Sequence, residues 1–198
     1  MFHFNESKLI DLLNEISSPC PAPGGGSVSA LLLAFSGALA SKVCNVTRSS
    51  DLAQDNLGHS TSIIEESIAL AEKDALGFHR VVKASREKQD LEEALYEASM
   101  IPLEVASRGL DFLEITLDTV RRGNPNARTD AIIASLLSLL ASQGGILNAG
   151  VNLKDMRQGA VKEKVQERFE ELRKRCMAME AKVRCEVDTY LNSIDKSL

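Results

Sequence analysis

Aromatic side chains are scarce in this sequence, which has no tryptophan, two tyrosines and six phenylalanines among 198 residues. Hydrophobic residues nevertheless make up 44% of the chain, which is enough for a packed core and argues against general disorder. Alanine, leucine, glutamate, lysine and serine dominate, a composition typical of helices packed through small and aliphatic side chains. We therefore expect one domain spanning residues 1–198.

An excess of positive charge is also lacking, because the formal net charge is −5. No basic face of the kind that nucleic acid requires can be read from the sequence, so we expect no nucleic-acid partner. The four cysteines, Cys20, Cys44, Cys176 and Cys185, show no CxxC pairing and no histidine at metal-ligand spacing. We expect them to be buried or half-buried free thiols, and we expect no metal. The first residues lack the basic region and apolar block of a signal peptide, which favours a soluble, cytoplasmic protein.

Strand-like alternation, two-residue hairpin signals and solenoid repeats are absent from the sequence as well. Apolar residues recur instead at spacings of three and four, which predicts helices. Pro102 is expected to kink or split the tract that contains it. The predicted helices cover residues 6–17, 27–47, 61–86, 88–121, a segment from Thr129-Asp130 to about 147 or 152, and 158–195, with a loop or frayed helix end at 48–60.

Two of these helices, 27–47 and the one that opens at Ala131, are apolar or small nearly all the way round. Such helices are buried in a core or in a membrane. The serines of the first helix and its short uncharged run favour the core. The last helix is amphipathic and on the order of 50 Å long, which exceeds the width of a small bundle. The fold class is thus predicted to be all-α: a single-domain helical bundle with two buried central helices and a long C-terminal amphipathic helix, part of which packs on a second chain in a homodimer.

The stretch from Pro19 to Ser27 is the clearest local motif. Three alternating prolines stiffen it, and Gly24, Gly25 and Gly26 leave the backbone bare before Ser27, a candidate N-cap. Free N–H groups at the positive end of a helix dipole suit a carboxylate, a phosphate or a polar heterocycle. The alternative is a tight packed turn. No Gly-Lys-Ser/Thr ending follows and no strand precedes it, so it is neither a Walker loop nor a dinucleotide fingerprint.

Other polar residues on predicted helices are weaker candidates. Asp74 falls on or beside an apolar face, Asp130 lies in the first turn of its helix, and Asn148 and Asn152 share a face because they are four residues apart. Each also has a structural interpretation, as a salt-bridged residue, a helix start or a helix cap. The three histidines are not paired with cysteine or serine at a motif spacing, and GxSxG and HExxH are missing, so nucleophilic and metal catalysis have little support.

Taken in order, these segments resemble one known family. The motif Pro21-Ala22-Pro23-Gly24-Gly25-Gly26-Ser27-Val28-Ser29-Ala30, continuing to Asn45-Val46-Thr47, resembles the cyclodeaminase/cyclohydrolase family of folate enzymes, which includes the C-terminal half of formiminotransferase-cyclodeaminase and stand-alone forms. Weaker matches follow at Asp74…Phe78, Ala98…Leu103, Gly123-Asn124 with Thr129-Asp130, and Asn148…Leu153, so the resemblance spans nearly the whole chain. This sequence departs from the pattern with Thr129 in place of serine and Gly77 in place of alanine; the second change could loosen the helix at the site.

The resemblance implies an all-α dimer that acts on the carbon between N5 and N10 of tetrahydrofolate. A formimidoyl-tetrahydrofolate cyclodeaminase joins N10 to the formimino carbon and releases ammonia; a 5,10-methenyl-tetrahydrofolate cyclohydrolase adds water to the methenyl carbon. Either reaction takes a tetrahydrofolate derivative as substrate and needs no metal. By this resemblance Asp74 or Asp130 is the general acid/base, and the residues that bind substrate are Pro23, Gly24, Gly25, Gly26, Ser27, Asn124, Asn148 and Asn152. A third alternative, which the change at Gly77 would fit, is a non-catalytic helical dimer that binds folate or a partner protein.

Overall fold

A computed structural model describes residue 4 and residues 6–47 and 50–195, with side chains left undescribed at 50–55. The described part is helical and contains no strand. Its elements are α1 (Leu9–Ser17), α2 (Gly25–Val46), α3 (Ser50–Glu87), α4 (Leu91–Arg122), the 3₁₀-helix η1 (Pro125–Ala127), α5 (Arg128–Asp155) and α6 (Ala160–Asp195). The predicted all-α class is confirmed.

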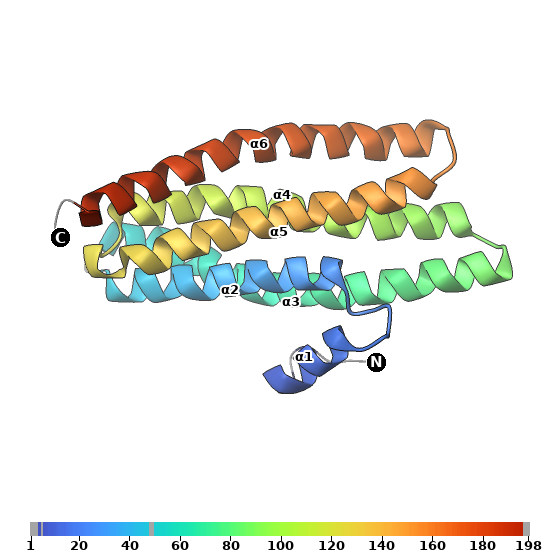
Figure 1. Cartoon of the computed structure of the whole chain (residues 1–198), viewed down its shortest axis with the longest axis horizontal. Coiled ribbons are helices and arrows are strands. Elements are labelled where there is room, and N and C mark those ends of the chain that lie inside the picture. The colour runs from blue at the N-terminus through green and yellow to red at the C-terminus, as the bar shows by residue number, and fades with distance from the viewer. Residues whose placement is uncertain (1–3, 5, 48–49, 196–198) are drawn as a thin grey trace.

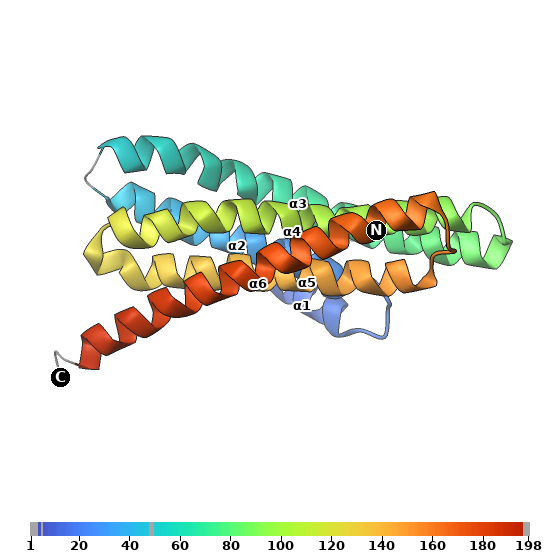
Figure 2. The same ribbon diagram turned by 90° about the horizontal axis from the view of Figure 1, so that it is seen from above.

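Helices α2 to α5 run side by side as an antiparallel bundle (Figure 1). α6 crosses the bundle diagonally over α4 and α5, and α1 stands apart from the other helices near the start of α2 (Figures 1 and 2). α1 contains no buried residue, although its apolar side chains recur with helical spacing. The order of the elements therefore places the glycine turn at the start of α2 in the middle of the long bundle, close to the end of α5.

The core forms where the apolar stripes of α4, α5 and α6 meet. α6 contributes Val165, Leu172, Cys176, Met179 and Val183, at the three- and four-residue spacings read from the sequence. α4 contributes Leu103, Leu110 and Leu113, which are fully buried. Burial of a Leu side chain stabilises a fold by roughly 1.5–3 kcal/mol, so this stripe is what fixes α6 on the bundle.

α2 and α5 pack closely through small side chains. The Ser36 hydroxyl donates to the Ala134 carbonyl at 2.7 Å and lies 2.9 Å from the hydroxyl of Ser138. Gly144 meets Ser29, whose Cβ would be 3.0 Å from a Cβ at residue 144. Ser36 thus has its partners on α5, whereas the Ser29 hydroxyl donates to the Gly25 carbonyl of its own helix at 2.6 Å, so both of these buried hydroxyls are satisfied in the core.

By length and composition, α2 and the segment Pro125–Asp155 would each be long and apolar enough to cross a membrane. The most apolar windows of the two segments are 61% and 56% buried in the bundle, and core helices of soluble proteins pass the same test. Both helices occupy the predicted central positions, with twelve buried residues each. α5 also carries an exposed apolar stripe on its outer side, whereas on α2 the exposed large apolar side chains are Phe35 and Val46.

The structure decides between alternatives that three local predictions left open. Residues 50–60 are not a loop but the first turns of α3; residues 48–49 lie outside the described part. Pro102 does not split α4, and α5 takes the longer of its two predicted ends, running through Gly144 and Gly145 to Asp155. The physical reason is the same in the last two cases: the missing Cβ of Gly145 lets α5 approach the backbone of α4 beside Pro102, and the packing of the two helices outweighs their local propensities.

Candidate active site

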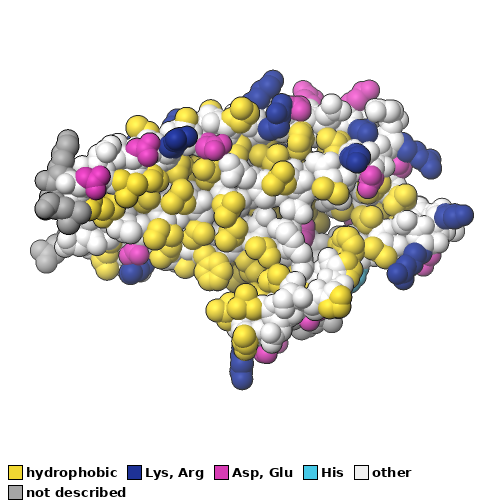
Figure 3. Space-filling view, in the orientation of Figure 1, with side chains coloured by type: hydrophobic (Ala, Val, Ile, Leu, Met, Phe, Trp, Pro, Cys, Tyr) yellow, Lys and Arg dark blue, Asp and Glu magenta, His cyan; other side chains and the backbone are white. Residues whose placement is uncertain are grey.

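A cavity of about 300 Å³ opens beside the start of α2. Figure 3 shows the hollow, between the segment that leads into α2 and the end of α5. Its walls come from that segment and from α2, α3, α4 and α5: Pro21, Ala22, Gly24, Gly25, Gly26, Asp74, Phe78, Val81, Leu95, Ala98, Asn148, Val151, Asn152 and Asp155. The glycine turn is therefore accessible from a cavity. It is not the tight, sealed turn of the alternative interpretation.

The helix start at the cavity is defined by Gly24. This residue is the N-cap in an extended conformation, and its carbonyl accepts the first helical hydrogen bond from the Val28 N–H at 3.0 Å. Ser27 is the third residue of the helix and is fully buried, so its prediction as the N-cap is wrong. The helix begins at the glycines because the alternating prolines before them lack backbone N–H groups, which prevents an earlier start. Gly24 offers no side chain to the N–H groups of the first turn, which need acceptors from elsewhere.

Asp74 of α3 supplies such an acceptor. Its Oδ2 accepts a hydrogen bond of 2.9 Å from the Ser27 hydroxyl, and the carboxylate also accepts from the backbone N–H of Ser27. A Cβ on Gly26 would lie 2.6 Å from the Asp74 Cγ, closer than real Cβ atoms approach. Only glycine at position 26 therefore allows a carboxylate from another helix to reach the first turn of α2.

The protonation of Asp74 is set by two opposing effects. Burial raises the pKa of its carboxyl above the ordinary value, and the hydrogen bonds from the hydroxyl and the backbone of Ser27 lower the pKa by less. Desolvation thus wins over a helix N-terminus that favours the anion. A half-buried carboxyl whose pKa is shifted in this direction, and which faces a cavity, holds a proton more readily than an exposed aspartate and is suited to take up and return one.

Two amides from α5 face the cavity, as their four-residue spacing predicts. The Asn148 side chain lies beside Gly25, and its Nδ2 donates to the carbonyl of Gly144 at 2.8 Å. The Nδ2 of Asn152 donates to the carbonyl of Ala98 on α4 at 2.8 Å. These bonds fix the orientation of both amides before a ligand arrives, which is what selective recognition of a polar heterocycle requires.

The remaining walls are mainly apolar, and one of their polar residues was missed by sequence analysis. Phe78, Val81, Leu95 and Val151 provide flat or aliphatic surface for a planar ligand. Asp155 lines the cavity near the end of α5. It lies three residues after Asn152 and seven after Asn148, so the helical spacing that linked the two amides pointed to it as well.

The predicted site residues do not all meet in one chain. Pro23 is buried beside the cavity but does not line it. Asp130 forms an ion pair with Lys42 at 2.8 Å, and the Asn124 side chain donates to the Val46 carbonyl at 2.8 Å. Lys42 is 17 residues along α2 from Gly25, so Asp130 and Asn124 lie about 26 Å or more from the cavity. Figure 1 shows this separation, with η1 at one end of the bundle and the start of α2 in its middle.

All four cysteines are free; Cys44 and Cys176 are buried, whereas Cys20 and Cys185 are exposed. Within the described ranges, no three histidine, cysteine, aspartate or glutamate side chains are grouped so that they could hold a metal ion. The polar groups of the cavity are those of Asp74, the two amides, Asp155 and the bare backbone of the glycine turn.

Fold and cavity together define a class: an all-helical protein with a small-molecule cavity in which the half-buried carboxylate of Asp74 caps a glycine-started helix. Comparison with known proteins places it more closely. A sequence model described as Formiminotransferase-cyclodeaminase matches residues 8–171. The chain belongs to this family.

Its relatives agree with that assignment. The chain is 28% identical over 185 residues to a rat formimidoyltransferase-cyclodeaminase, covering 84% of this chain and 34% of the rat protein. It is 27% identical to a methenyltetrahydrofolate cyclohydrolase of Methylorubrum extorquens, covering 81% of this chain and 84% of that one. The chain thus spans about a third of the mammalian relative and most of the bacterial one.

A solved structure shares the fold. The crystal structure of formiminotetrahydrofolate cyclodeaminase from Thermotoga maritima superposes with a TM-score of 0.81 at 25% identity, covering 94% of this chain and 98% of that chain. The arrangement of helices described above is therefore that of a known helical domain.

Proposed function

We propose that this protein is a folate one-carbon enzyme, a formimidoyl-tetrahydrofolate cyclodeaminase that converts 5-formimino-tetrahydrofolate to 5,10-methenyl-tetrahydrofolate and ammonia. The observation that carries this proposal is the Asp74 carboxylate, held at the cavity wall by Ser27 and by a glycine that no other residue can replace. The names of the rat and Thermotoga relatives support the substrate. We further propose a lyase class, a homodimer, a cytoplasmic location and one domain, without a nucleic-acid or membrane partner.

The proposed reaction needs one proton relay and no protein nucleophile. N10 of the substrate attacks the formimino carbon, so a carbon–nitrogen bond forms and N10 becomes acidic. The formimino group enters in its protonated, amidinium form; Asp74, as the carboxylate, accepts the N10 proton and returns it to the terminal nitrogen, which then leaves as neutral ammonia when its bond to the carbon breaks. The cationic methenyl carbon that remains lies near the same carboxylate, which stabilises it electrostatically.

Binding uses the rest of the cavity. The amides of Asn148 and Asn152 are oriented to meet the donor and acceptor edge of a pterin, and Phe78, Val81 and Leu95 contact its faces. The backbone of Gly24 to Gly26 leaves room for a ligand to approach the first turn of α2. A cavity of about 300 Å³ suits the bicyclic ring rather than a whole folate, whose remaining part would extend outward.

A second candidate is 5,10-methenyl-tetrahydrofolate cyclohydrolase. It is favoured by the Methylorubrum relative, because the match spans 81% of this chain and 84% of that protein. The same carboxylate would then take a proton from the water that adds to the methenyl carbon. Both reactions place a cationic one-carbon centre at one position, so the cavity serves either chemistry.

A spectrophotometric assay at the methenyl absorbance separates the candidates. Absorbance that grows from 5-formimino-tetrahydrofolate supports the cyclodeaminase, and absorbance that decays from methenyl-tetrahydrofolate faster than the buffer control supports the cyclohydrolase. Tight binding of a reduced folate without turnover of either substrate would overturn both and leave the non-catalytic folate-binding dimer.

A further inference from the structure

A second hollow, with a volume of about 670 Å³, lies between α3 and α4. Its walls include Lys73, Leu76, Gly77 and Arg80 of α3 and Met100 and Ile101 of α4, and it is called the α3–α4 groove below. On α3, Asp74 and Phe78 line the cavity, whereas Lys73 and Gly77, each one residue earlier, line the groove. A Cβ on Gly77 would lie 3.9 Å from the Cβ of Ala98, which lines the cavity, so the contact between the two helices separates the two hollows.

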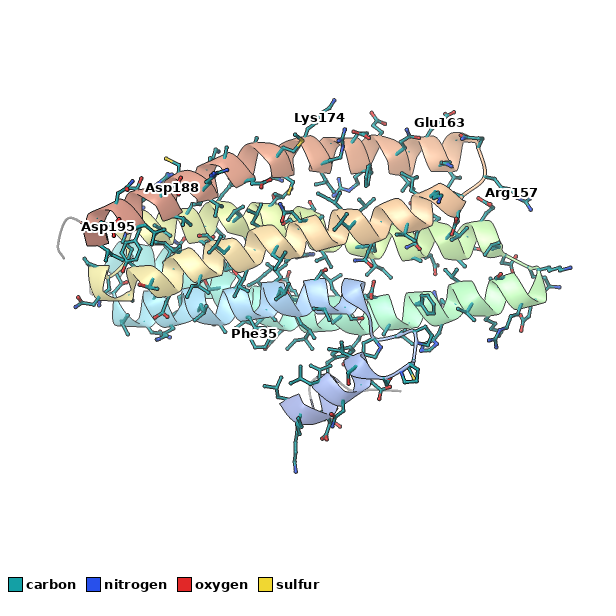
Figure 4. All side chains as sticks on the ribbon, in the orientation of Figure 1. Phe35, Arg157, Glu163, Lys174, Asp188 and Asp195 are labelled. Carbon is teal, nitrogen blue, oxygen red and sulfur yellow. The ribbon has the colours of Figure 1, made fainter. Side chains whose placement is uncertain are left out.

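The groove lies where α3 runs on past the start of α2. Gly26, in the first turn of α2, lies against Asp74, and α3 continues from there to Glu87 with α4 beside it (Figures 1 and 4). Gly77, the residue that departs from the family pattern, lies in this stretch and does not interrupt the helix. A Cβ at this position would lie 3.2 Å from the Cδ1 of Ile101. The missing side chain therefore shapes the groove and not the cavity.

The floor of the groove is apolar. Leu76 and Gly77 of α3 meet Tyr96, Met100 and Ile101 of α4 along it. Leu76 is 39% exposed, although a large aliphatic side chain gains free energy when it is removed from water. A concave apolar surface with a few polar groups at its edge is typical of sites for small molecules.

The edge of the groove is positively charged. Lys73, Arg80 and Lys83 follow one another at spacings of seven and three residues, so they lie on one side of α3. Glu97 on the opposite wall pairs with Arg80. Within the described residues, neither lysine has a carboxylate at ion-pair distance, and both lysines are exposed. Three cations and one carboxylate leave two positive charges uncompensated, in a chain whose formal net charge is −5.

The charge changes sign beyond Lys83. The adjoining hollow, towards the turn between α3 and α4, carries Glu87, Asp90 and Glu93. An anion is repelled there, so the positive part of the groove ends at Lys83. From Lys73 to Lys83 it is about 15 Å long by helical rise.

We propose that the α3–α4 groove is a second ligand site, which binds a free anionic amphiphile: a molecule with an extended apolar body and a carboxylate head. The body lies on Leu76, Met100 and Ile101, and the head pairs with a lysine at one end of this floor. Exposed ion pairs contribute little free energy, so affinity comes mainly from the apolar body, and the lysines select the sign of the head. The proposal does not rest on the proposed function, because the groove shares no lining residue with the cavity in the described part of the chain.

NMR of the methionine methyl groups tests the site without any turnover. The protein, labelled with ¹³C at these methyl groups, is titrated with dodecanoate below its critical micelle concentration. The Met100 signal, assigned with Met100→Leu, should shift and saturate, whereas that of Met177, which is exposed on α6, should stay constant. An unchanged Met100 signal, or parallel shifts of both signals, overturns the proposal. So does an equal shift with dodecyltrimethylammonium, because the sign of the head would then not matter.

Charge reversal tests the role of the lysines. The double variant Lys73→Glu, Lys83→Glu should raise the Kd of dodecanoate on the order of tenfold, because two attractive contacts become repulsive. Lys174→Glu is the matched control, since this exposed lysine points away from the bundle on the outer side of α6 (Figure 4). It should bind dodecanoate like the wild type. Equal affinity in the double variant and the control overturns the proposal.

Two competing occupants are tested with the same protein. Saturating 5-formyl-tetrahydrofolate should leave the Kd of dodecanoate unchanged; displacement would make the groove part of the folate site and overturn a second site. Wild-type protein that sediments with phosphatidylglycerol vesicles, but whose Met100 signal does not respond to dodecanoate, would show a membrane surface and overturn a site for a free ligand. If neither folate substrate is turned over, the proposed function fails while the methyl shifts still decide the groove.

Discussion

Gly26 is the residue on which the geometry of the cavity most directly depends. Gly26→Ala places a Cβ against the Asp74 carboxylate and forces it away from Ser27. We expect turnover to fall on the order of 100-fold and stability to fall by about 1–3 kcal/mol. The matched control is Gly58→Ala, because a Cβ there meets nothing within 4 Å; it should raise the free energy of unfolding by roughly 0.5–1 kcal/mol. Urea denaturation and the methenyl assay measure both effects, and equal behaviour of the two variants would contradict this account.

The Asp74 carboxylate is expected to be needed for turnover, although its burial costs the folded protein stability. Asp74→Asn should lower kcat by about 10²- to 10⁴-fold if the carboxylate is the proton relay. Asp188→Asn, an exposed aspartate on α6, is the control and should retain full activity. An Asp74→Asn variant with near-native turnover would remove this residue from the mechanism.

The same substitution has a pH-dependent effect on stability. Since burial raises the pKa of Asp74, the folded state holds this proton more tightly than the unfolded state, and the carboxyl costs stability as pH rises from about 4 through the folded pKa. The asparagine is neutral throughout. The melting temperature of Asp74→Asn minus that of the wild type should therefore be more positive at pH 7.5 than at pH 4. A difference that is constant or reversed across this range would show that the pKa of Asp74 is not raised.

For single residues, the sequence predicted which side chains of one helix lie on the same side. It did not predict which side chains of different helices meet. Asn148 and Asn152 were linked correctly by a four-residue spacing, and the glycine turn was identified from its composition. The bond between Asp74 and Ser27 joins residues 47 positions apart, and no local pattern predicts which helix turn a carboxylate will reach. Asn124 and Asp130 were grouped with the cavity by order along the chain, which does not fix distance in space.

Among the elements, the crossing of α4 and α5 depends on the absence of a side chain at Gly145. A Cβ at this position would lie 3.0 Å from the Ala106 N and closer still to the carbonyl of Pro102. We expect Gly145→Ala to destabilise the protein by about 1–3 kcal/mol although alanine is the better helix former. Chemical denaturation beside Gly58→Ala separates the steric effect from helix propensity; a stabilised Gly145→Ala would mean that the two helices are not in such close contact.

Helix existence was predictable, and helix ends were predictable only where an apolar stripe runs up to them. The apolar spacing of α6 predicted its bounds to within two residues, because packing against α4 and α5 follows that stripe. The polar residues at 50–60 contain no such stripe. They are helical because the later part of α3 packs on α2 and α4, and the helix extends back from there. Gly144 and Gly145 suggested an end to α5, but in the bundle they are contact points between helices.

For the whole molecule, dimerisation should couple stability to concentration. If the proposed homodimer buries the exposed apolar residues of α5, among them Leu140, the melting temperature of the wild type rises with protein concentration, because mass action favours the folded dimer. The Leu140→Glu chain should melt at a temperature independent of concentration. Differential scanning fluorimetry over a hundredfold dilution series measures this, and a wild-type melting temperature unaffected by dilution would count against the dimer.

The position of Cys20 offers a direct optical probe of the cavity. This exposed thiol directly precedes Pro21 at the cavity wall, whereas the other exposed thiol, Cys185, is on α6. An environment-sensitive fluorophore attached to Cys20 in a Cys185→Ser background should change its emission when a reduced folate is titrated in. The same dye on Cys185 in a Cys20→Ser background should stay constant. The two labelled proteins together would report occupancy in real time, independently of turnover.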